Sequence, residues 1–129
     1  MPSNKRVALI TGSASGIGKA GALAFSRGGY DVIINYSRSA DQAKETAKLC
    51  RELGATALLV KCDVADDLEV LSMIDTCETN YGRLDVLVNN AGMTMKTPPQ
   101  NISEVNLDEW DRVFAVNVRG LFQVSRAAV

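Results

Sequence analysis

The sequence of 129 residues contains no histidine, which excludes the Ser-His-Asp and Cys-His nucleophile arrangements within this chain. Cysteine is also scarce: Cys50, Cys62 and Cys77 lie far apart, are odd in number and form no C-x-x-C pair. This pattern predicts neither a disulfide framework nor a zinc site, and we expect no metal ion. Reduced thiols of this kind are typical of cytoplasmic proteins.

A large excess of charge is absent as well, since the net charge is −1 with both signs mixed along the chain. Neither a nucleic acid nor a membrane is therefore expected as a partner, because no charged patch would attract one. Near the N-terminus the sequence has a single short apolar run, residues 7–10, which is too short for a signal peptide or a membrane span. The length predicts one domain over residues 1–129.

Short apolar runs alternate with amphipathic stretches along the whole chain. We predict strands at residues 6–11, 31–36, 57–61 and 84–89. We predict helices at residues 15–27, 39–53, 66–81 and 106–129. This alternation indicates an α/β fold, a Rossmann-type doubly wound parallel sheet with strand order 3-2-1-4.

Local signals support these boundaries. Ser39 with Gln42, Asp66 with Glu69, and Asn106 with Glu109 have the three-residue spacing of a helix capping box. The stretch 93–106 is predicted to be a loop, because Pro98 and Pro99 exclude an ordinary helix there.

A glycine-rich turn, Thr11-Gly12-Ser13-Ala14-Ser15-Gly16-Ile17-Gly18, follows the first apolar run. It matches neither G-x-G-x-x-G nor the P-loop pattern. A strand, a glycine turn and a helix together place backbone N–H groups and a helix N-terminus against a phosphate. Glycine is required where a Cβ would block the phosphate or the turn itself. The alternative interpretation is a flexible turn without a ligand.

The T-G-x-x-x-G-I-G run resembles the cofactor turn of the short-chain dehydrogenase/reductase family. Three further motifs follow in the family's order: Asp63-Val64, Asn89-Asn90-Ala91-Gly92 and Asn117-Val118-Arg119-Gly120. The resemblance covers the whole chain, which corresponds to about the N-terminal half of such a family member. Among its members, the sequence looks most like the 3-oxoacyl-acyl-carrier-protein reductases, with sugar or alcohol dehydrogenases as the alternative.

The resemblance implies a set of cofactor-binding residues and one catalytic residue. In the family, an Asp at position 63 lies by the adenine ring and accepts from its amino group. Asn117 would be the catalytic residue, helping to hold a water in a proton relay. It falls on the apolar stripe of the last helix, where we expect a buried amide, and the alternative is a structural Asn bonded to backbone. The implied cofactor-binding residues are Gly12, Ser13, Ser15, Gly16, Ile17, Gly18, Tyr36, Ser37, Arg38, Asp63, Val64, Asn90, Ala91 and Gly92.

The end of the second strand bears on the choice of cofactor. An acidic residue there would bind the ribose 2′-OH and favour NAD. The sequence instead has Asn35-Tyr36-Ser37-Arg38, and no carboxylate occurs before Asp41. Arg38 can pair with a 2′-phosphate and Ser37 can donate to it, so we predict NADP in preference to NAD. A solvated surface arginine is the alternative.

The reaction implied by the resemblance is hydride transfer to a carbonyl, on a small-molecule or acyl-carrier-bound substrate. The family's proton donor is a Tyr followed four residues later by Lys. Met93, Met95 and Lys96 are candidate substrate contacts, and the alternative is a mobile surface loop. No tyrosine in this sequence has the required lysine, because the residues four positions after Tyr30, Tyr36 and Tyr81 are Ile34, Ala40 and Asp85. We therefore expect no ketone reduction by this chain alone.

The fourth apolar run, residues 84–88, is almost continuously hydrophobic and would have neighbours on both edges in a complete sheet. We therefore expect the sequence to stop before a fifth strand. The apolar last helix or an exposed fourth strand is expected to make the chain a homo-oligomer. The alternative to an enzyme part is a non-catalytic NADP-binding or interaction module.

Overall fold

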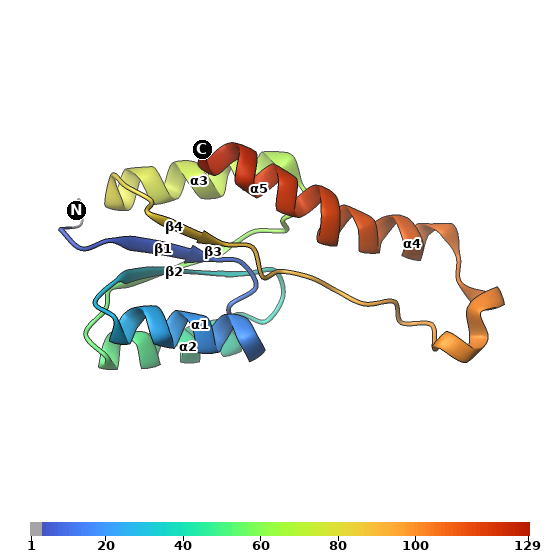
Figure 1. Ribbon diagram of the computed structural model, residues 1–129, viewed down its shortest axis with the longest axis horizontal. Coiled ribbons are helices and arrows are strands. Elements are labelled where there is room, and N and C mark those ends of the chain that lie inside the picture. The colour runs from blue at the N-terminus through green and yellow to red at the C-terminus, as the bar shows by residue number, and fades with distance from the viewer. Residues whose placement is uncertain (1–3) are drawn as a thin grey trace.

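The computed structural model describes residues 4–129 and contains one parallel sheet with the order β3-β2-β1-β4, which confirms the predicted fold class. The strands are β1 (Val7–Ile10), β2 (Asp31–Tyr36), β3 (Ala57–Lys61) and β4 (Val86–Val88). The helical elements are α1 (Gly16–Arg27), α2 (Ala40–Glu52), α3 (Asp67–Tyr81), η1 (Pro99–Glu104), α4 (Leu107–Phe114), η2 (Ala115–Gly120) and α5 (Leu121–Ala128). Figure 1 shows α1 and α2 below the sheet and α3 with α5 above it.

The core consists of two apolar layers, one on each face of the sheet. Successive side chains of a strand point to opposite faces, so Val7 and Leu9 pack toward α3 and α5. Ala8 and Ile10 pack toward α1 and α2 on the other face. All four residues of β1 are fully buried, as expected for a central parallel strand covered by helices on both sides.

The strand β4 is shorter than predicted, at three residues instead of six. Its residues are half-buried, and among the described residues it pairs with β1 alone. Before the start of β4, the Asp85 side chain takes the place of a backbone partner for β1. Its carboxylate accepts from the backbone N–H of Val7 at 2.8 Å and from Arg83 at 2.7 and 2.8 Å. The Arg83 guanidinium, with the Val7 N–H, lowers the pKa of the Asp85 carboxyl.

The predicted helix starts are confirmed at Asp66 and Asn106, whose side chains accept from the backbone N–H groups of the first turn. The capping box at Ser39 is wrong, because Ser39 precedes the helix without a side-chain cap. Its ψ of 64° departs from the extended conformation that N-cap residues adopt. Neither glutamate closes a box: Glu69 accepts from the N–H of Asp63, and Glu109 accepts from the preceding loop.

The last helix runs from residue 107 to 128, but it is not a regular α-helix throughout. Residues Ala115–Gly120 form a π-helical segment, a rare widening that occurs frequently at functional sites. In Figure 1, α4 extends beyond the sheet, together with the 93–106 loop and the 3-10 helix η1. No helix of the described residues is long and apolar enough to cross a membrane.

Gly120 fastens this helix to the turn after β3. A Cβ at Gly120 would lie 2.8 Å from Cγ2 and 3.1 Å from the carbonyl oxygen of Val64, both inside the packed core. A side chain there would push the helix off the turn or displace a buried valine.

Gly120→Ala is therefore expected to destabilise the fold by about 1–3 kcal/mol, the usual cost of overpacking. The measurement is the urea midpoint of unfolding. Gly21→Ala is the matched control, since Gly21 also lies within a helix but has open space around it. This control should leave stability unchanged or raise it by about 0.5–1 kcal/mol, because alanine favours helix. Equal midpoints for the two variants would contradict this packing argument.

Candidate functional site

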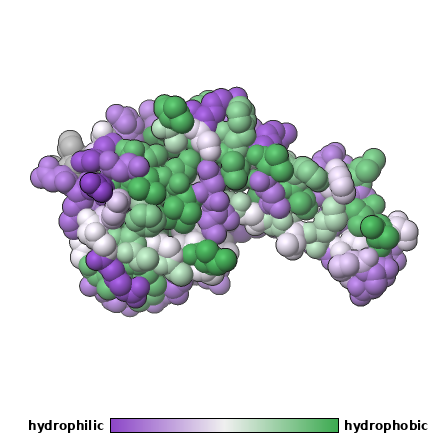
Figure 2. Space-filling view, viewed as in Figure 1, coloured by the Kyte–Doolittle hydropathy of each residue, from purple (hydrophilic) through white to green (hydrophobic). Residues whose placement is uncertain are grey.

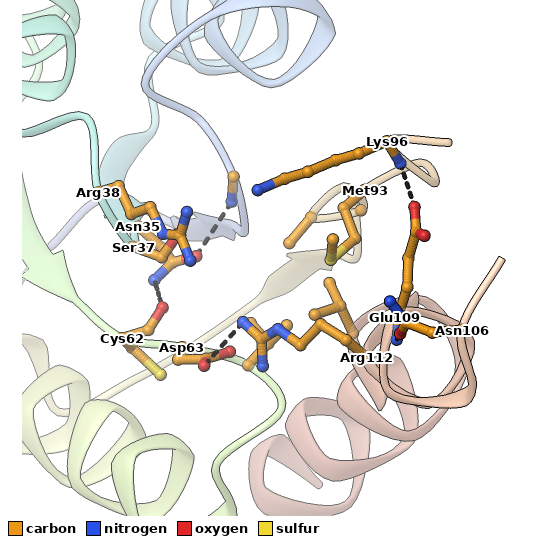
Figure 3. A pocket seen from close by; sticks show the side chains of 15 residues that line it. Asn35, Ser37, Arg38, Cys62, Asp63, Met93, Lys96, Asn106, Glu109 and Arg112 are labelled. Carbon is orange, nitrogen blue, oxygen red and sulfur yellow. Dashed lines mark hydrogen bonds and ion pairs between the residues drawn. The ribbon is translucent and has the colours of Figure 1, made fainter. Parts of the chain in front are cut away.

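Residues of three of the four motifs noted in the sequence line a cavity of about 500 Å³ at the carboxyl end of the sheet. The fourth motif lies behind its wall, where Asn117 bonds to Met93 and Gly120 packs on Val64. Figure 3 shows the residues around the cavity: Asn35, Ser37 and Arg38 lie on one side and Glu109 with Arg112 on the other. Strand order reverses between β1 and β4, because β2 and β3 continue on one side of β1 and β4 lies on the other. Ligands of open α/β sheets bind at this kind of switch point.

Thr11 and Asn90 join the glycine turn to the N-N-A-G turn. The Thr11 hydroxyl accepts from the backbone N–H groups of Asn90 at 3.0 Å and Ala91 at 2.9 Å. The Asn90 amide in turn donates to the carbonyl oxygens of Thr11 at 3.1 Å and Gly12 at 3.0 Å. These reciprocal bonds fix the two turns at the ends of β1 and β4 against each other.

The three glycines of the turn are required for different reasons. Gly12 has φ +62°, and a Cβ there would lie 2.9 Å from the Cα of Ala91. Gly18 packs against the Gly12 carbonyl and the Asn90 amide, so a side chain there would separate the two turns. At Gly16, φ is +60° and nothing lies within 4 Å of a Cβ position, so this part of the turn is open to a ligand. At positions 12 and 18, contacts inside the protein are already enough to require glycine.

Asn35, at the end of β2, is a buried residue whose role the sequence reasoning missed. Its side-chain oxygen accepts from the N–H of Gly12 at 3.0 Å, and its amide nitrogen donates to the carbonyl of Cys62 at 3.1 Å. Its backbone exchanges hydrogen bonds with Ser13, which is also buried. Asn35 therefore ties the glycine turn to the end of β3. A polar residue directly after the apolar run 32–34 was the available signal.

The cavity brings together half of the predicted cofactor-binding residues. Those that line it are Gly12, Ser37, Arg38, Asp63, Val64, Ala91 and Gly92. Ser15, Gly16 and Ile17 are exposed at the start of α1, outside the cavity lining. Ser13, Gly18 and Asn90 serve the internal contacts of the two turns. Tyr36 packs against the core on the α1 and α2 face instead of lining the cavity.

Asn117 is exposed rather than buried, which corrects the expectation from its place on the apolar stripe. Its amide makes two bonds to one residue: it accepts from the N–H of Met93 at 2.8 Å and donates to the Met93 carbonyl at 2.7 Å. It lies in the π-helical segment, and the widened backbone presents it to the loop. The side chain therefore bonds to backbone, and its catalytic role stays a prediction.

Glu109 holds the next part of the same loop. Its carboxylate accepts from the backbone N–H and the hydroxyl of Thr97, at 2.9 and 2.7 Å, and from the backbone N–H of Lys96. The hydrogen bonds from Thr97 lower the pKa of Glu109. In Figure 3 the Lys96 side chain extends into the cavity toward the Asn35 side. Lys96 and Met93, two of the three candidate substrate contacts, line the cavity, whereas Met95 does not.

Asp63 and Arg112 form an ion pair of 2.9 Å at the cavity wall. Asp63 follows β3, and Arg112 comes from α4. Asp63 was predicted from its motif, but Arg112 was missed. Arg112 lies one turn before Val116 on the cavity face, and this position depends on how the helix packs on the rest of the fold.

Cys62 also lines the cavity but is unsuited to nucleophilic chemistry. Its side chain is buried, and burial raises the pKa of the thiol to about 12. The thiolate, which is the reactive form, is therefore scarce at neutral pH. In the part of the chain that the structure describes, no group of three metal-ligating side chains lies together.

Comparison with known proteins gives the same family as the motifs. A family model described as short chain dehydrogenase matches residues 6–129. Trihydroxynaphthalene reductase from Colletotrichum orbiculare is 37% identical over 123 residues, which are 95% of this chain and 43% of that protein. A short chain dehydrogenase from Burkholderia cenocepacia, solved in complex with NADP, is 36% identical with a TM-score of 0.88. The match covers 95% of this chain and 49% of that one.

A structure of NAD+-bound xylitol dehydrogenase also matches, with 29% identity and a TM-score of 0.88, over 95% of this chain and 46% of that one. The chain spans about half the length of the curated relatives it matches. Those relatives bear the names of several different reductases, so a particular likeness to 3-oxoacyl-acyl-carrier-protein reductases is not supported. With the family model covering nearly all of its residues, this chain belongs to the short-chain dehydrogenase family of oxidoreductases.

Proposed function

We propose that this chain forms the NADP(H)-binding half of an oxidoreductase that reduces a carbonyl group. The observation that carries the proposal is the cavity at the switch point, with Ser37 and Arg38 on the wall where a ribose 2′-substituent would be recognised. One solved relative is described with NADP and another with NAD, so the choice between them depends on this chain's own residues.

The residues present fit a dinucleotide. The open backbone at Gly16 and the N-terminus of α1 offer N–H groups to a diphosphate. Ser15, at the N-cap, makes no capping bond with its hydroxyl. Arg38 is exposed and forms no ion pair within residues 4–129, so its guanidinium is available to a 2′-phosphate. Among the described residues, the carboxylates that line the cavity are Asp63 and Glu109, and they already bond to Arg112 and to Thr97.

When bound, the nicotinamide would supply the hydride for a carbonyl carbon. Asn117 is proposed as the catalytic-site residue of this half, and its bonds to Met93 fix the loop beside it. The alkoxide that forms needs a proton donor, and the sequence contains no Tyr-x-x-x-Lys. Reduction is therefore expected to require residues beyond these 129.

A ketone of the 3-oxoacyl or polyketide type is the proposed substrate class. The support is the name of one relative, the granaticin polyketide synthase putative ketoacyl reductase 2 from Streptomyces violaceoruber, which is 38% identical over 123 residues. Met93 and Lys96, which line the cavity from the loop after the N-N-A-G turn, would approach such a substrate or the cofactor beside it.

The cofactor preference is tested by titrating Arg38→Ala with NADPH and NADH, followed by nicotinamide fluorescence. A hydrogen bond to a charged group is worth roughly 1.5–3 kcal/mol, so NADPH affinity should fall about ten- to a hundredfold while NADH affinity changes little. Arg27→Ala, at an exposed arginine at the end of α1, should bind both dinucleotides as the unchanged chain does. An unchanged NADPH to NADH ratio in Arg38→Ala would refute the preference.

A second proposal, of a homo-oligomer, comes from the outer face of the last helix. Trp110, Phe114, Val118, Leu121 and Phe122 are each between 47% and 58% exposed. Figure 2 shows hydrophobic surface along this part of the molecule. Trp110 and Phe114 also stack, with ring centroids 5.0 Å apart, so they form one continuous apolar surface. An apolar stripe of this kind marks an association site, and a second copy of the chain can present the same stripe to it.

The association is tested by light scattering on a sizing column with the double variant Phe114→Ser and Leu121→Ser. The unchanged chain should elute as an oligomer and this variant as a monomer. Leu53→Ser is the control, because Leu53 is 39% exposed at the end of α2, which lies on the opposite face of the sheet from α5. The proposal would be contradicted if the control variant also dissociated. It would equally be contradicted if the unchanged chain were monomeric at about 100 µM, which is roughly a hundred times a micromolar Kd.

A further inference from the structure

The Asp63–Arg112 ion pair joins two walls of the cavity that are far apart in sequence. The Arg112 guanidinium reaches from α4 to the Asp63 carboxylate, which lies just after β3, at 2.9 Å. Figure 3 shows the pair at the cavity, with both side chains among those that line it. Nothing in the family motifs of this chain includes Arg112.

We propose that Arg112 is a positioning residue, which orients the Asp63 carboxylate to accept the exocyclic amino group of a bound adenine. The inference rests on the proposed function, since it takes the adenine end of the cofactor to lie at Asp63. It goes further by assigning to α4 a part in distinguishing one purine from another.

The carboxylate has acceptor capacity left for such a ligand. One Asp63 oxygen accepts from the N–H of Ala65 at 3.0 Å, and the other meets Arg112. A carboxylate offers about four acceptor positions on its two oxygens, so roughly two stay open. The two existing partners come from different elements and hold the group at both oxygens. Its open positions are therefore fixed before a ligand arrives, which reduces the entropy lost on binding.

The helix that carries Arg112 is itself fastened to the Asp63 turn. Gln123 donates to the carbonyl oxygen of Val64 at 2.8 Å, and Arg119 donates to that of Ala65 at 3.2 Å. Gly120 packs directly on Val64. The distance between Arg112 and Asp63 is thus set by three contacts further along the same helix, and the pair does not depend on two free side chains finding each other.

The pair is poorly placed to act mainly on stability. The side chains of Arg112 and Asp63 are 40% and 32% exposed, and ion pairs in such settings contribute little to folding. Removing the guanidinium is therefore expected to leave the fold unchanged and to alter ligand recognition. This separates a positioning role from a structural one.

The test compares NADPH with its 6-deamino analogue, in which a carbonyl oxygen replaces the adenine amino group. The amino group donates to a carboxylate, whereas the carbonyl oxygen repels it, so the 129-residue chain should prefer NADPH by about tenfold or more. In Arg112→Met this preference should fall to about threefold or less, with an unchanged urea midpoint. Arg112→Lys, which keeps a cation but not the planar fork, should recover part of the preference.

Arg119→Met is the matched control, because Arg119 contacts the same turn through the Ala65 carbonyl and does not touch Asp63. It should keep the tenfold preference even where it lowers both affinities. Equal loss of affinity for both dinucleotides in Arg112→Met would overturn the positioning role. Equal binding of the two dinucleotides by the unchanged chain would also overturn it, but would leave the proposed function intact. Binding of neither dinucleotide by the unchanged chain would overturn both the inference and the proposed function.

Discussion

The site depends on how closely separate stretches of backbone approach one another at the carboxyl end of the sheet. A Cβ at Gly12 would lie 2.9 Å from the Ala91 backbone, and one at Gly120 would lie 2.8 Å from Val64. Gly92 is similarly close to Asn117, at 3.3 Å. Each of these motif glycines therefore contacts a residue of another motif. The motifs are thus the two sides of the same contacts, and none can be altered alone without moving its partner.

Buried polar groups give this arrangement its rigidity. The buried Thr11 and Asn35 and the half-buried Asn90 together bond eight backbone groups in and after three strands. Within residues 4–129, no buried side-chain nitrogen or oxygen lacks a partner. An unsatisfied buried group costs about 1–3 kcal/mol, so these residues fix one arrangement of the turns. The side chains of Arg38 and Lys96 are therefore presented to the cavity from a rigid frame.

Much of the fold could be predicted from the sequence, because alternating apolar runs and glycine stops report directly on a parallel sheet. The strand order, the strands β2 and β3 and the caps at Asp66 and Asn106 belong to this part. The exposure of Asn117 and the role of Arg112 could not be predicted in this way. Both depend on where α4 extends relative to the sheet, and local periodicity cannot distinguish a helix face that meets the core from one that continues past it. The capping box at Ser39 failed for a related reason, since the spacing of residues does not fix the backbone angles before the helix.

The π-helical segment follows from the spacing of the residues that the last helix must direct inward. Arg112, Val116, Gly120 and Val124 all face the cavity wall, the Asp63 turn or the core, and they are spaced by four residues. In a regular α-helix each step of four overshoots a full turn by about 40°, so Arg112 and Val124 would point in directions about 120° apart. A wider turn between them takes up part of this drift and keeps the inward residues on one side. The widening at Ala115–Gly120 thus allows one helix to line the cavity at its start and to pack in the core at its end. It also places Asn117 in a position that a regular helix would not give it.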